Sequence, residues 1–314
     1  MPNMQQGSIH LFRRAGIDVF LHWSWFLVAA YEIESRKGKY SSVLWNVLEY
    51  LALFLIVLTH EFGHALACRQ VGGKANRIML WPLGGVAFVD PPQRPGATLW
   101  SIAAGPLVNV ALLLPLGAAI FMSQTLGWPQ SIPDVDTFVW SVFKINAGLL
   151  IFNLLPFYPL DGGQILRSLL WFPLGRARSL MVSTALGIVG VIGFIAWAVQ
   201  AESIWMGAIA VFMLMNCWSG LRQAKILLRV EKIPRRDGFR CPNCRTKPPL
   251  GARWRCDLCK QPFDTFQTGA VCPNCSKHFP QTMCGDCGKF FTMSEWIEGS
   301  DAGMGVINGG SPVK

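Results

Sequence analysis

Six long apolar runs occupy most of the first 225 residues and set the first expectation for the fold. They cover residues 17–32, 44–67, 98–122, 137–156, 179–199 and 204–224, and each is near the roughly 20 residues of a membrane-spanning helix. Pro156 and Pro159 interrupt the end of the fourth run, and irregular backbone at membrane depth is tolerated only beside protein or a watery cavity. The pattern predicts an all-α polytopic protein with six transmembrane helices in a lipid bilayer.

One stretch between the second and third runs departs from the helical pattern. Residues 72–90, GGKANRIMLWPLGGVAFVD, hold two strand-like segments, RIML and VAFV, and Gly84-Gly85 supplies a turn between them. Pro82 within this stretch and Pro91-Pro92 after it limit the length of the strands. We therefore expect a short β-hairpin over residues 77–90.

Composition supports the membrane interpretation over a large soluble protein with buried helices. Hydrophobic residues make up 52% of the chain and charged residues 15%, against about 25% charged residues in soluble domains. The net charge of +10 could indicate nucleic-acid binding, but membrane proteins gather basic residues on cytoplasmic loops that face anionic lipid. A cleavable signal peptide is not expected, because Arg13-Arg14 leads into GIDVFLHWSWFLVAA with no small-residue cleavage site after it.

Basic residues follow the second, fourth and sixth runs, whereas residues 123–136 and 200–203 contain no Lys or Arg. This distribution predicts a cytoplasmic-membrane protein with both termini in the cytoplasm. SRKGKY, residues 35–40, disagrees, because it places three basic residues on the expected outer side. In this topology the second and fourth runs both end at the cytoplasmic face, so their C-terminal ends meet at one depth.

The second run ends in LIVLTHEFGHALA, which carries His60, Glu61 and His64. Residues four apart share one face of a helix, so the two imidazoles can bind one metal ion together. Glu61 is one position further round and can contact a metal-bound water. This H-E-x-x-H spacing is typical of a Zn²⁺ site with a glutamate base. The alternative is a pair of histidines satisfied by hydrogen bonds inside a helical bundle.

A catalytic zinc needs a third protein ligand and an open position for water. Asp161, in NLLPFYPLDGG at residues 153–163, is the favoured candidate because it lies at the matching depth in the interrupted region. Gly162-Gly163 gives the chain freedom to turn there. The alternative role for Asp161 is a helix N-cap. Among the other histidines, His22 is more consistent with hydrogen bonding than with ligation, and the remaining two are His10 and His278.

HEFGH and NLLPFYPLDGG at the ends of two spans resemble the site-2 protease family of intramembrane metalloproteases. AGPLVN, residues 104–109, is similar to the family's G-P-x-x-N element, and GIDVFLHWSWF is similar to the opening of its compact prokaryotic members. The resemblance covers roughly residues 10–225. It implies that His60, His64 and Asp161 ligate a catalytic zinc and that Glu61 is the catalytic base. It also implies that Asn153 helps to hold the substrate or its oxyanion.

We therefore expect an intramembrane zinc endopeptidase that cleaves transmembrane segments of other membrane proteins. The rival from another class is a catalytically inactive membrane scaffold, or zinc-binding adaptor, that acts through its cysteine-rich region. Glu61 argues against this rival, because an inactive protein has no use for the base. A zinc transporter is weaker still, since the sequence offers one membrane site only.

Eight of the ten cysteines lie between residues 241 and 287, in four C-x-x-C pairs. They predict two structural Cys₄ zinc sites and so, with the catalytic ion, three zinc ions. Local pairing, first pair with second and third with fourth, is the simplest arrangement, and a crossed pairing of first with third is the alternative. The pairs are Cys241/Cys244, Cys256/Cys259, Cys272/Cys275 and Cys284/Cys287.

The chain is accordingly expected to form a six-span membrane metalloprotease domain over residues 1–230 and a cytosolic double zinc ribbon-like domain over residues 231–295. Residues 296–314 are expected to be a disordered tail. The basic approach to the ribbons, RVEKIPRRDGFR, is compatible with lipid headgroups or nucleic acid. A protein partner is favoured over nucleic acid at the ribbons, and the oligomeric state is left open.

Overall fold

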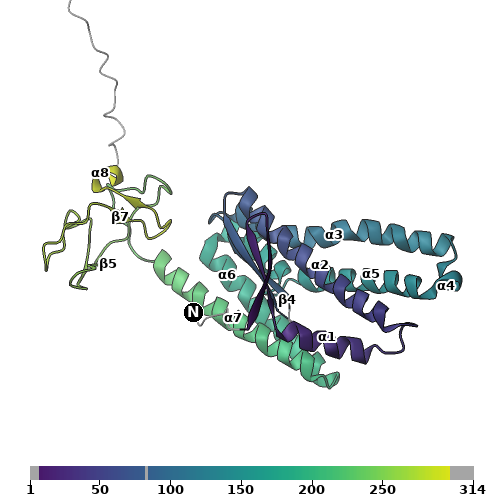
Figure 1. Cartoon of the computed structure of the whole chain (residues 1–314). Coiled ribbons are helices and arrows are strands. Elements are labelled where there is room, and N and C mark those ends of the chain that lie inside the picture. The colour runs from purple at the N-terminus through teal and green to yellow at the C-terminus, as the bar shows by residue number, and fades with distance from the viewer. Residues whose placement is uncertain (1–6, 82–83, 298–314) are drawn as a thin grey trace, which may run out of the picture. The chain divides into compact units, whose positions relative to one another are not determined.

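The computed structural model describes residues 7–81 and 84–297. The chain divides into two compact units between Leu228 and Arg229, and their elements are drawn in Figure 1. The first unit contains a four-stranded sheet and a bundle of helices. The second unit contains the cysteine pairs, held by short strands and turns.

Four helices among the described residues are long and apolar enough to cross a membrane: α2 (Val43–Gln70), α3 (Pro95–Thr125), α5 (Pro133–Leu154) and α6 (Asp161–Gln200). Helix α6 is broken at Gly175, where φ is 79° and ψ is 172°, so it consists of two helical segments. The short helix α4 (Trp128–Ser131) connects α3 to α5, and α7 (Ile204–Glu231) covers the sixth apolar run. The four spanning candidates match the second to fifth predicted runs.

The prediction of six spans requires the first apolar run to form one spanning helix. The structure does not show this. The run divides into strand β2 (Ile17–His22) and helix α1 (Ser24–Ser35). At 12 residues, α1 is about 18 Å long, whereas the hydrocarbon core of a bilayer is about 30 Å thick. The alternation in IDVFLH explains the strand, because Ile17, Val19 and Leu21 are buried on one face.

The expected helical fold with one short hairpin is confirmed only in part, because the hairpin belongs to a mixed sheet of the first unit in the order β1-β2-β3-β4. β1 (Ser8–Arg14) is antiparallel to β2, β2 is parallel to β3 (Lys74–Trp81), and β3 is antiparallel to β4 (Gly84–Asp90). The predicted hairpin is therefore present but longer. Gly84 and Gly85 do not form its turn but begin β4, opposite Trp81 and Leu80; residues 82–83 lie outside the described residues.

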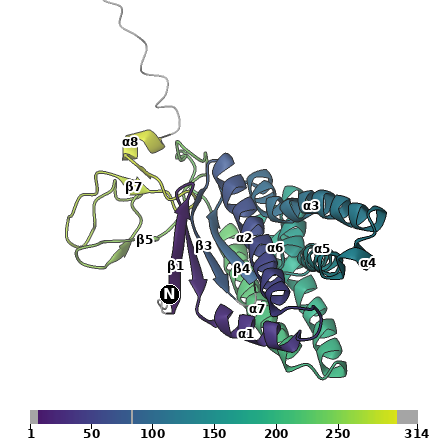
Figure 2. The same ribbon diagram turned by 45° about the vertical axis from the view of Figure 1, so that its right-hand side comes forward.

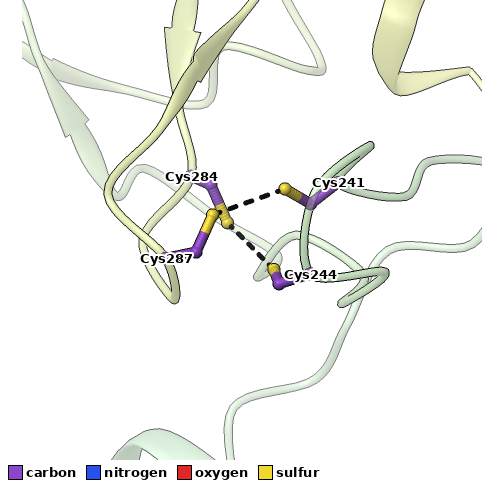
Figure 3. A group of neighbouring side chains, drawn as sticks. All are labelled: Cys241, Cys244, Cys284 and Cys287. Atoms are coloured by element: carbon purple, nitrogen blue, oxygen red, sulfur yellow. Dashed lines mark hydrogen bonds between the residues drawn. The ribbon is translucent and has the colours of Figure 1, made fainter. Parts of the chain in front are cut away.

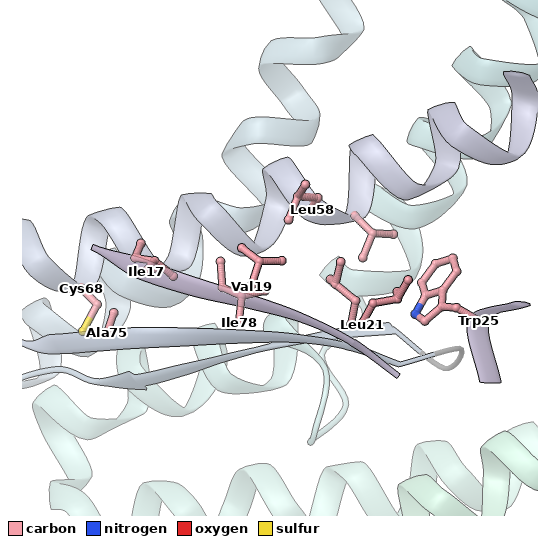
Figure 4. Close-up of a cluster of buried hydrophobic side chains, with 11 residues drawn as sticks. Ile17, Val19, Leu21, Trp25, Leu58, Cys68, Ala75 and Ile78 are labelled. Atoms are coloured by element: carbon pink, nitrogen blue, oxygen red, sulfur yellow. The ribbon is translucent and has the colours of Figure 1, made fainter. Parts of the chain in front are cut away.

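One face of the sheet packs on α2 to form the core of the first unit (Figure 4). Ile17, Val19 and Ile78 on the strands face Leu58 and Cys68 on the helix. Figure 2 shows the strands lying alongside α2, with β4 on the side of the bundle. The core thus fixes the edge strand β4 beside the helix that carries the H-E-x-x-H motif.

The second unit is built from two small two-stranded sheets. β5 (Trp254–Arg255) pairs with β6 (Pro262–Phe263), and β7 (Thr282–Met283) pairs with β8 (Phe290–Phe291). Helix α8 (Met293–Trp296) follows, and its Trp296 is 1% exposed and packs edge-on against Phe266. The described structure therefore includes residue 296, at the start of the expected tail; residues 298–314 lie outside the described residues.

Candidate metal centres

The two histidines of α2 and the first residue of α6 converge although they are about 100 positions apart in sequence. Asp161 Oδ2 lies 3.0 Å from His60 Nε2 and 3.3 Å from His64 Nε2, and the two Nε2 atoms are 3.1 Å apart. Zinc–nitrogen and zinc–oxygen bonds of about 2.0–2.1 Å give tetrahedral ligand separations of about 3.3–3.4 Å. The three atoms are therefore spaced to hold one zinc ion.

The alternative role of Asp161 as a helix N-cap is not the one that the structure shows. The N-cap position of α6 is Leu160, with no side-chain capping hydrogen bond, and the carboxylate of Asp161 faces the imidazoles instead. Gly162 and Gly163 let the helix start here, because a Cβ on Gly162 would lie 2.3 Å from the Leu154 carbonyl oxygen. On Gly163 it would lie 2.4 Å from the carbonyl carbon of Phe157.

Both imidazoles are oriented by acceptors on α3. His60 Nδ1 lies 2.5 Å from Asn109 Oδ1, and His64 Nδ1 lies 2.9 Å from the Ser101 carbonyl oxygen. Since both partners accept, each Nδ1 carries the proton and each Nε2 presents its lone pair to the cluster. Such hydrogen bonds orient metal-binding histidines and raise their basicity. The donor set and its support therefore fit a divalent zinc ion.

Asn109, Ser101 and Gly105 contact the histidines of the cluster or let α3 approach them, and reasoning from the sequence did not assign them a role. Asn109 is fully buried, and its amide donates to Asn146 Oδ1 at 2.8 Å while the Asn146 amide donates back to its carbonyl. Gly105 permits the close approach of α3, because a Cβ there would lie 2.3 Å from His64 Nε2. The signal was present in AGPLVN, which contains both Gly105 and Asn109.

Glu61 is buried beside the cluster and lines a cavity of about 490 Å³ together with His60, His64 and Asp161. Its Oε2 accepts a hydrogen bond of 2.7 Å from the Ala87 backbone N–H of β4. The strand comes this close because it has Gly85, where a Cβ would lie 2.3 Å from Glu61 Cγ. Asn153 also lines the cavity, so the structure brings all five candidate residues to one space.

The other histidines are not part of this cluster. His22 stacks on Trp81 with ring centroids 4.6 Å apart and contacts the Ser24 hydroxyl through Nδ1 at 2.5 Å. His10 pairs with Asp18 at 3.2 Å. The backbone of His278 forms an isolated bridge with Val271 in the second unit.

The eight paired cysteines form two clusters, and their pairing is nested. Cys241 and Cys244 join Cys284 and Cys287 (Figure 3), and the two inner pairs join each other. Both predicted arrangements, local and crossed, are therefore wrong. The inner ribbon is an insertion between the two halves of the outer ribbon. The inner cluster consists of Cys256, Cys259, Cys272 and Cys275.

The nearest sulfur atoms across the clusters are 3.6–3.7 Å apart. A tetrahedral Zn–S₄ centre with bonds of about 2.3 Å has edges of about 3.8 Å, so both clusters fit zinc.

All four C-x-x-C pairs have the same local backbone, which explains how so short a segment presents its sulfurs. In the first, the Cys241 N–H donates to the Thr246 carbonyl, and the Arg245 N–H donates back to the Cys241 carbonyl. The residue after each second cysteine has positive φ, a conformation that L-residues adopt rarely. These four residues are Arg245, Lys260, Ser276 and Gly288.

Comparison with known proteins finds a family match within the first unit. Residues 49–197 match Peptidase family M50. A zinc metalloprotease of Methanocaldococcus jannaschii is 32% identical over 182 residues, which are 57% of this chain and 50% of that protein. Stage IV sporulation protein FB of Bacillus subtilis is 34% identical over 140 residues, 43% of this chain and 46% of that one. The chain thus spans about half the length of these relatives.

Among solved structures, the chain is similar to the site-2 protease from Methanocaldococcus jannaschii, with a TM-score of 0.49 and 27% identity over 68% of this chain and 95% of that one. The apolar helices and the family match together indicate a multi-pass membrane protein. The matched segment contains the two imidazoles, Glu61 and the carboxylate that meet at the cavity. Residues 49–197 therefore match peptidase family M50 and contain all four of these residues.

Proposed function

We propose that this protein is an intramembrane zinc endopeptidase that cleaves transmembrane segments of other membrane proteins. The observation that carries the proposal is the convergence of His60, His64 and Asp161 within hydrogen-bonding distance of one another, with Glu61 lining the same cavity. The names of the relatives, which include zinc metalloprotease, support the same conclusion.

The chemistry divides between the metal and the residues of the chain. His60, His64 and Asp161 would hold a zinc ion, and such an ion would supply polarisation of the scissile carbonyl and a water molecule with a pKa near about 7. Glu61, which lines the same cavity, would act as the base that takes a proton from the attacking water and would return it to the leaving amine. Asn153, on the wall of the cavity, donates a hydrogen bond to the oxyanion that develops on the substrate.

The edge strand β4 supports a route for the substrate. A substrate helix satisfies its backbone groups internally, so it must unwind locally before a peptide bond can reach the site. β4 ends the sheet, and the Ala87 N–H on its outer edge reaches Glu61. An unwound substrate segment pairs along this edge. The other use of the hairpin is to cover the site against lipid.

The proposed orientation places the active-site end and both termini on the cytoplasmic side of the cytoplasmic membrane. The basic stretch at residues 35–40, which disagrees with this topology, contains Arg36 and Lys39. Both contact the buried carboxylate of Glu49, the lysine at 2.7 Å. The disagreement with the topology stays, because the rule counts Lys and Arg and not net charge.

The two cysteine clusters are proposed to hold two structural zinc ions, which brings the total to three per chain. Zinc stabilises so small a unit because its four-cysteine sites form only on folding. The ribbon unit is proposed to dock a protein partner in the cytoplasm. Nucleic acid is the less favoured ligand of its basic residues.

The direct test compares the wild type with Glu61→Gln and His60→Ala, purified in detergent or reconstituted, on candidate membrane substrates. Both variants should lose cleavage; His60→Ala should also lose one zinc equivalent, whereas Glu61→Gln should keep it. Cleavage at the wild-type rate in both variants would refute the peptidase assignment. A metal count of two in the wild type would indicate an empty membrane site and support the scaffold alternative.

A further inference from the structure

Two arginines that the proposed chemistry does not use lie against one tryptophan near the start of α6. The guanidinium carbon of Arg167 is 6.0 Å from the centre of the Trp171 ring, and that of Arg176 is 5.8 Å from it. Arg167 and Trp171 are four residues apart and share a helix face. Arg176 follows the break at Gly175, so the two arginines reach the same indole from different helical segments.

Neither arginine has a carboxylate partner among the described residues, and the Nε atoms of both are buried without a hydrogen-bond partner. Guanidinium groups stay charged at any physiological pH. Two like charges within about 6 Å of one ring repel, and buried N–H donors left unpaired cost free energy. Attraction to the face of the indole offsets only part of this cost, so an anion bound at the other guanidinium nitrogens would stabilise the pair.

Apolar side chains beside the arginines indicate what kind of molecule carries that anion. Leu169, Phe172 and Leu174 are all exposed, Phe172 by 63%. They belong to the part of α6 that precedes the break. Because the protein is a multi-pass membrane protein, we expect these side chains to contact lipid acyl chains. A soluble anion would explain the arginines but not these side chains.

We propose that Arg167, Trp171 and Arg176 form a binding site for the phosphate of an anionic phospholipid headgroup. The guanidinium N–H groups donate hydrogen bonds to the phosphate oxygens. Such charge-assisted hydrogen bonds are stronger than those between neutral groups. The acyl chains lie over the exposed apolar residues of the same helical segment. Arg167 is six residues beyond Asp161, about 9 Å along the helix, so the lipid sits close to the candidate metal centre without contacting its ligands.

The site is tested by counting phosphatidylglycerol molecules that stay bound to the detergent-solubilised full-length protein in native mass spectrometry. The test variant is Arg167→Gln with Arg176→Gln. The matched control is Arg178→Gln, an exposed neighbour with no partner among the described residues. We expect wild type and Arg178→Gln to retain one tightly bound phosphatidylglycerol and the double variant to bind it about tenfold or more weakly. Phosphatidylcholine should compete poorly.

Three outcomes overturn the proposal. Equal loss of affinity in Arg178→Gln and in the double variant would mean diffuse surface charge. Inorganic phosphate that displaces the lipid at the lipid's own concentration would assign the site to a free anion. Unchanged lipid binding in the double variant would show that these two arginines do not form a lipid site. An unaltered zinc count and melting temperature show that the double variant is folded, and neither measurement depends on peptidase activity.

Discussion

The side-chain oxygen of Asn109 lies 2.5 Å from Nδ1 of His60, which comes 49 residues earlier in the chain. This contact fixes which nitrogen of His60 carries the proton, and so directs the other nitrogen toward Asp161. Helix α3 contributes no metal ligand, but it therefore orients a histidine ligand of α2 for metal binding. Changes at such supporting residues should impair the site even though none of them touches the metal.

Replacing Asn109 with alanine should weaken binding at the membrane zinc site while leaving the ribbon sites loaded. Loss of a partner that orients a histidine ligand typically costs about 10–100-fold in metal affinity. The measurement is a chelator competition that follows loss of the most weakly held zinc equivalent. Asn216→Ala is the control, since Asn216 lines the same cavity but donates to the carbonyl of Phe212 on its own helix. An equal effect of both variants would contradict the role of Asn109.

Gly105→Ala should destroy the membrane zinc site. The added methyl group would lie 2.3 Å from His64 Nε2 and 2.8 Å from His60 Nε2, so the imidazoles or α3 must move, at a cost of about 1–3 kcal/mol in stability. Gly117→Ala on the same helix meets nothing within 4 Å and should be neutral or stabilising by up to about 1 kcal/mol. Zinc content and thermal unfolding in detergent measure both effects. Full zinc content in the Gly105 variant would show that the helices are not packed as described.

The contrast between these residues and the ligands shows what the sequence could predict. His60 and His64 are one helical turn apart, so the period of the helix alone places them together. Asp161 was predicted to lie near them because the second and fourth runs cross the membrane in the same direction and end at the same depth. The contact of Asn109 depends instead on how closely α3 packs on α2, and that distance is set by small residues. At Gly63, for example, a Cβ would lie 2.8 Å from the Ala104 carbonyl oxygen.

The first apolar run shows why apolar content alone was a poor guide to the N-terminal part. IDVFLHWSWFLVAA contains enough apolar residues for a span, but its first six alternate with period two. They form β2, which pairs in parallel with β3 more than 50 positions later. Parallel strands are not joined by a short turn, so the sequence around β2 gives no local sign of its pairing with β3. For this reason only the β3–β4 hairpin of the four-stranded sheet was predicted.

Gly85→Ala should lower the rate of peptide cleavage without releasing zinc. Its methyl group would lie 2.3 Å from Glu61 Cγ and 2.5 Å from Oε1, so the proposed base must move while the metal ligands stay in place. A displacement of about 1 Å can cost roughly 100-fold in rate. Gly96→Ala, where the methyl group meets nothing within 4 Å, should cleave at the wild-type rate. Loss of zinc in the Gly85 variant would mean that β4 supports the metal ligands and not the base.

The nested pairing of the ribbons was not predicted, because closing a longer loop adds little entropic cost and so sequence proximity does not decide which pairs meet. It is tested by two double variants that each remove two cysteines. Cys241→Ser with Cys284→Ser removes two ligands from one cluster, so the chain should lose one zinc. Cys241→Ser with Cys256→Ser damages both clusters, so it should lose two. Local pairing of the first pair with the second predicts the reverse order, since Cys241 and Cys256 would then share one ion. Zinc per chain, measured by elemental analysis on equal amounts of folded protein, distinguishes the two arrangements.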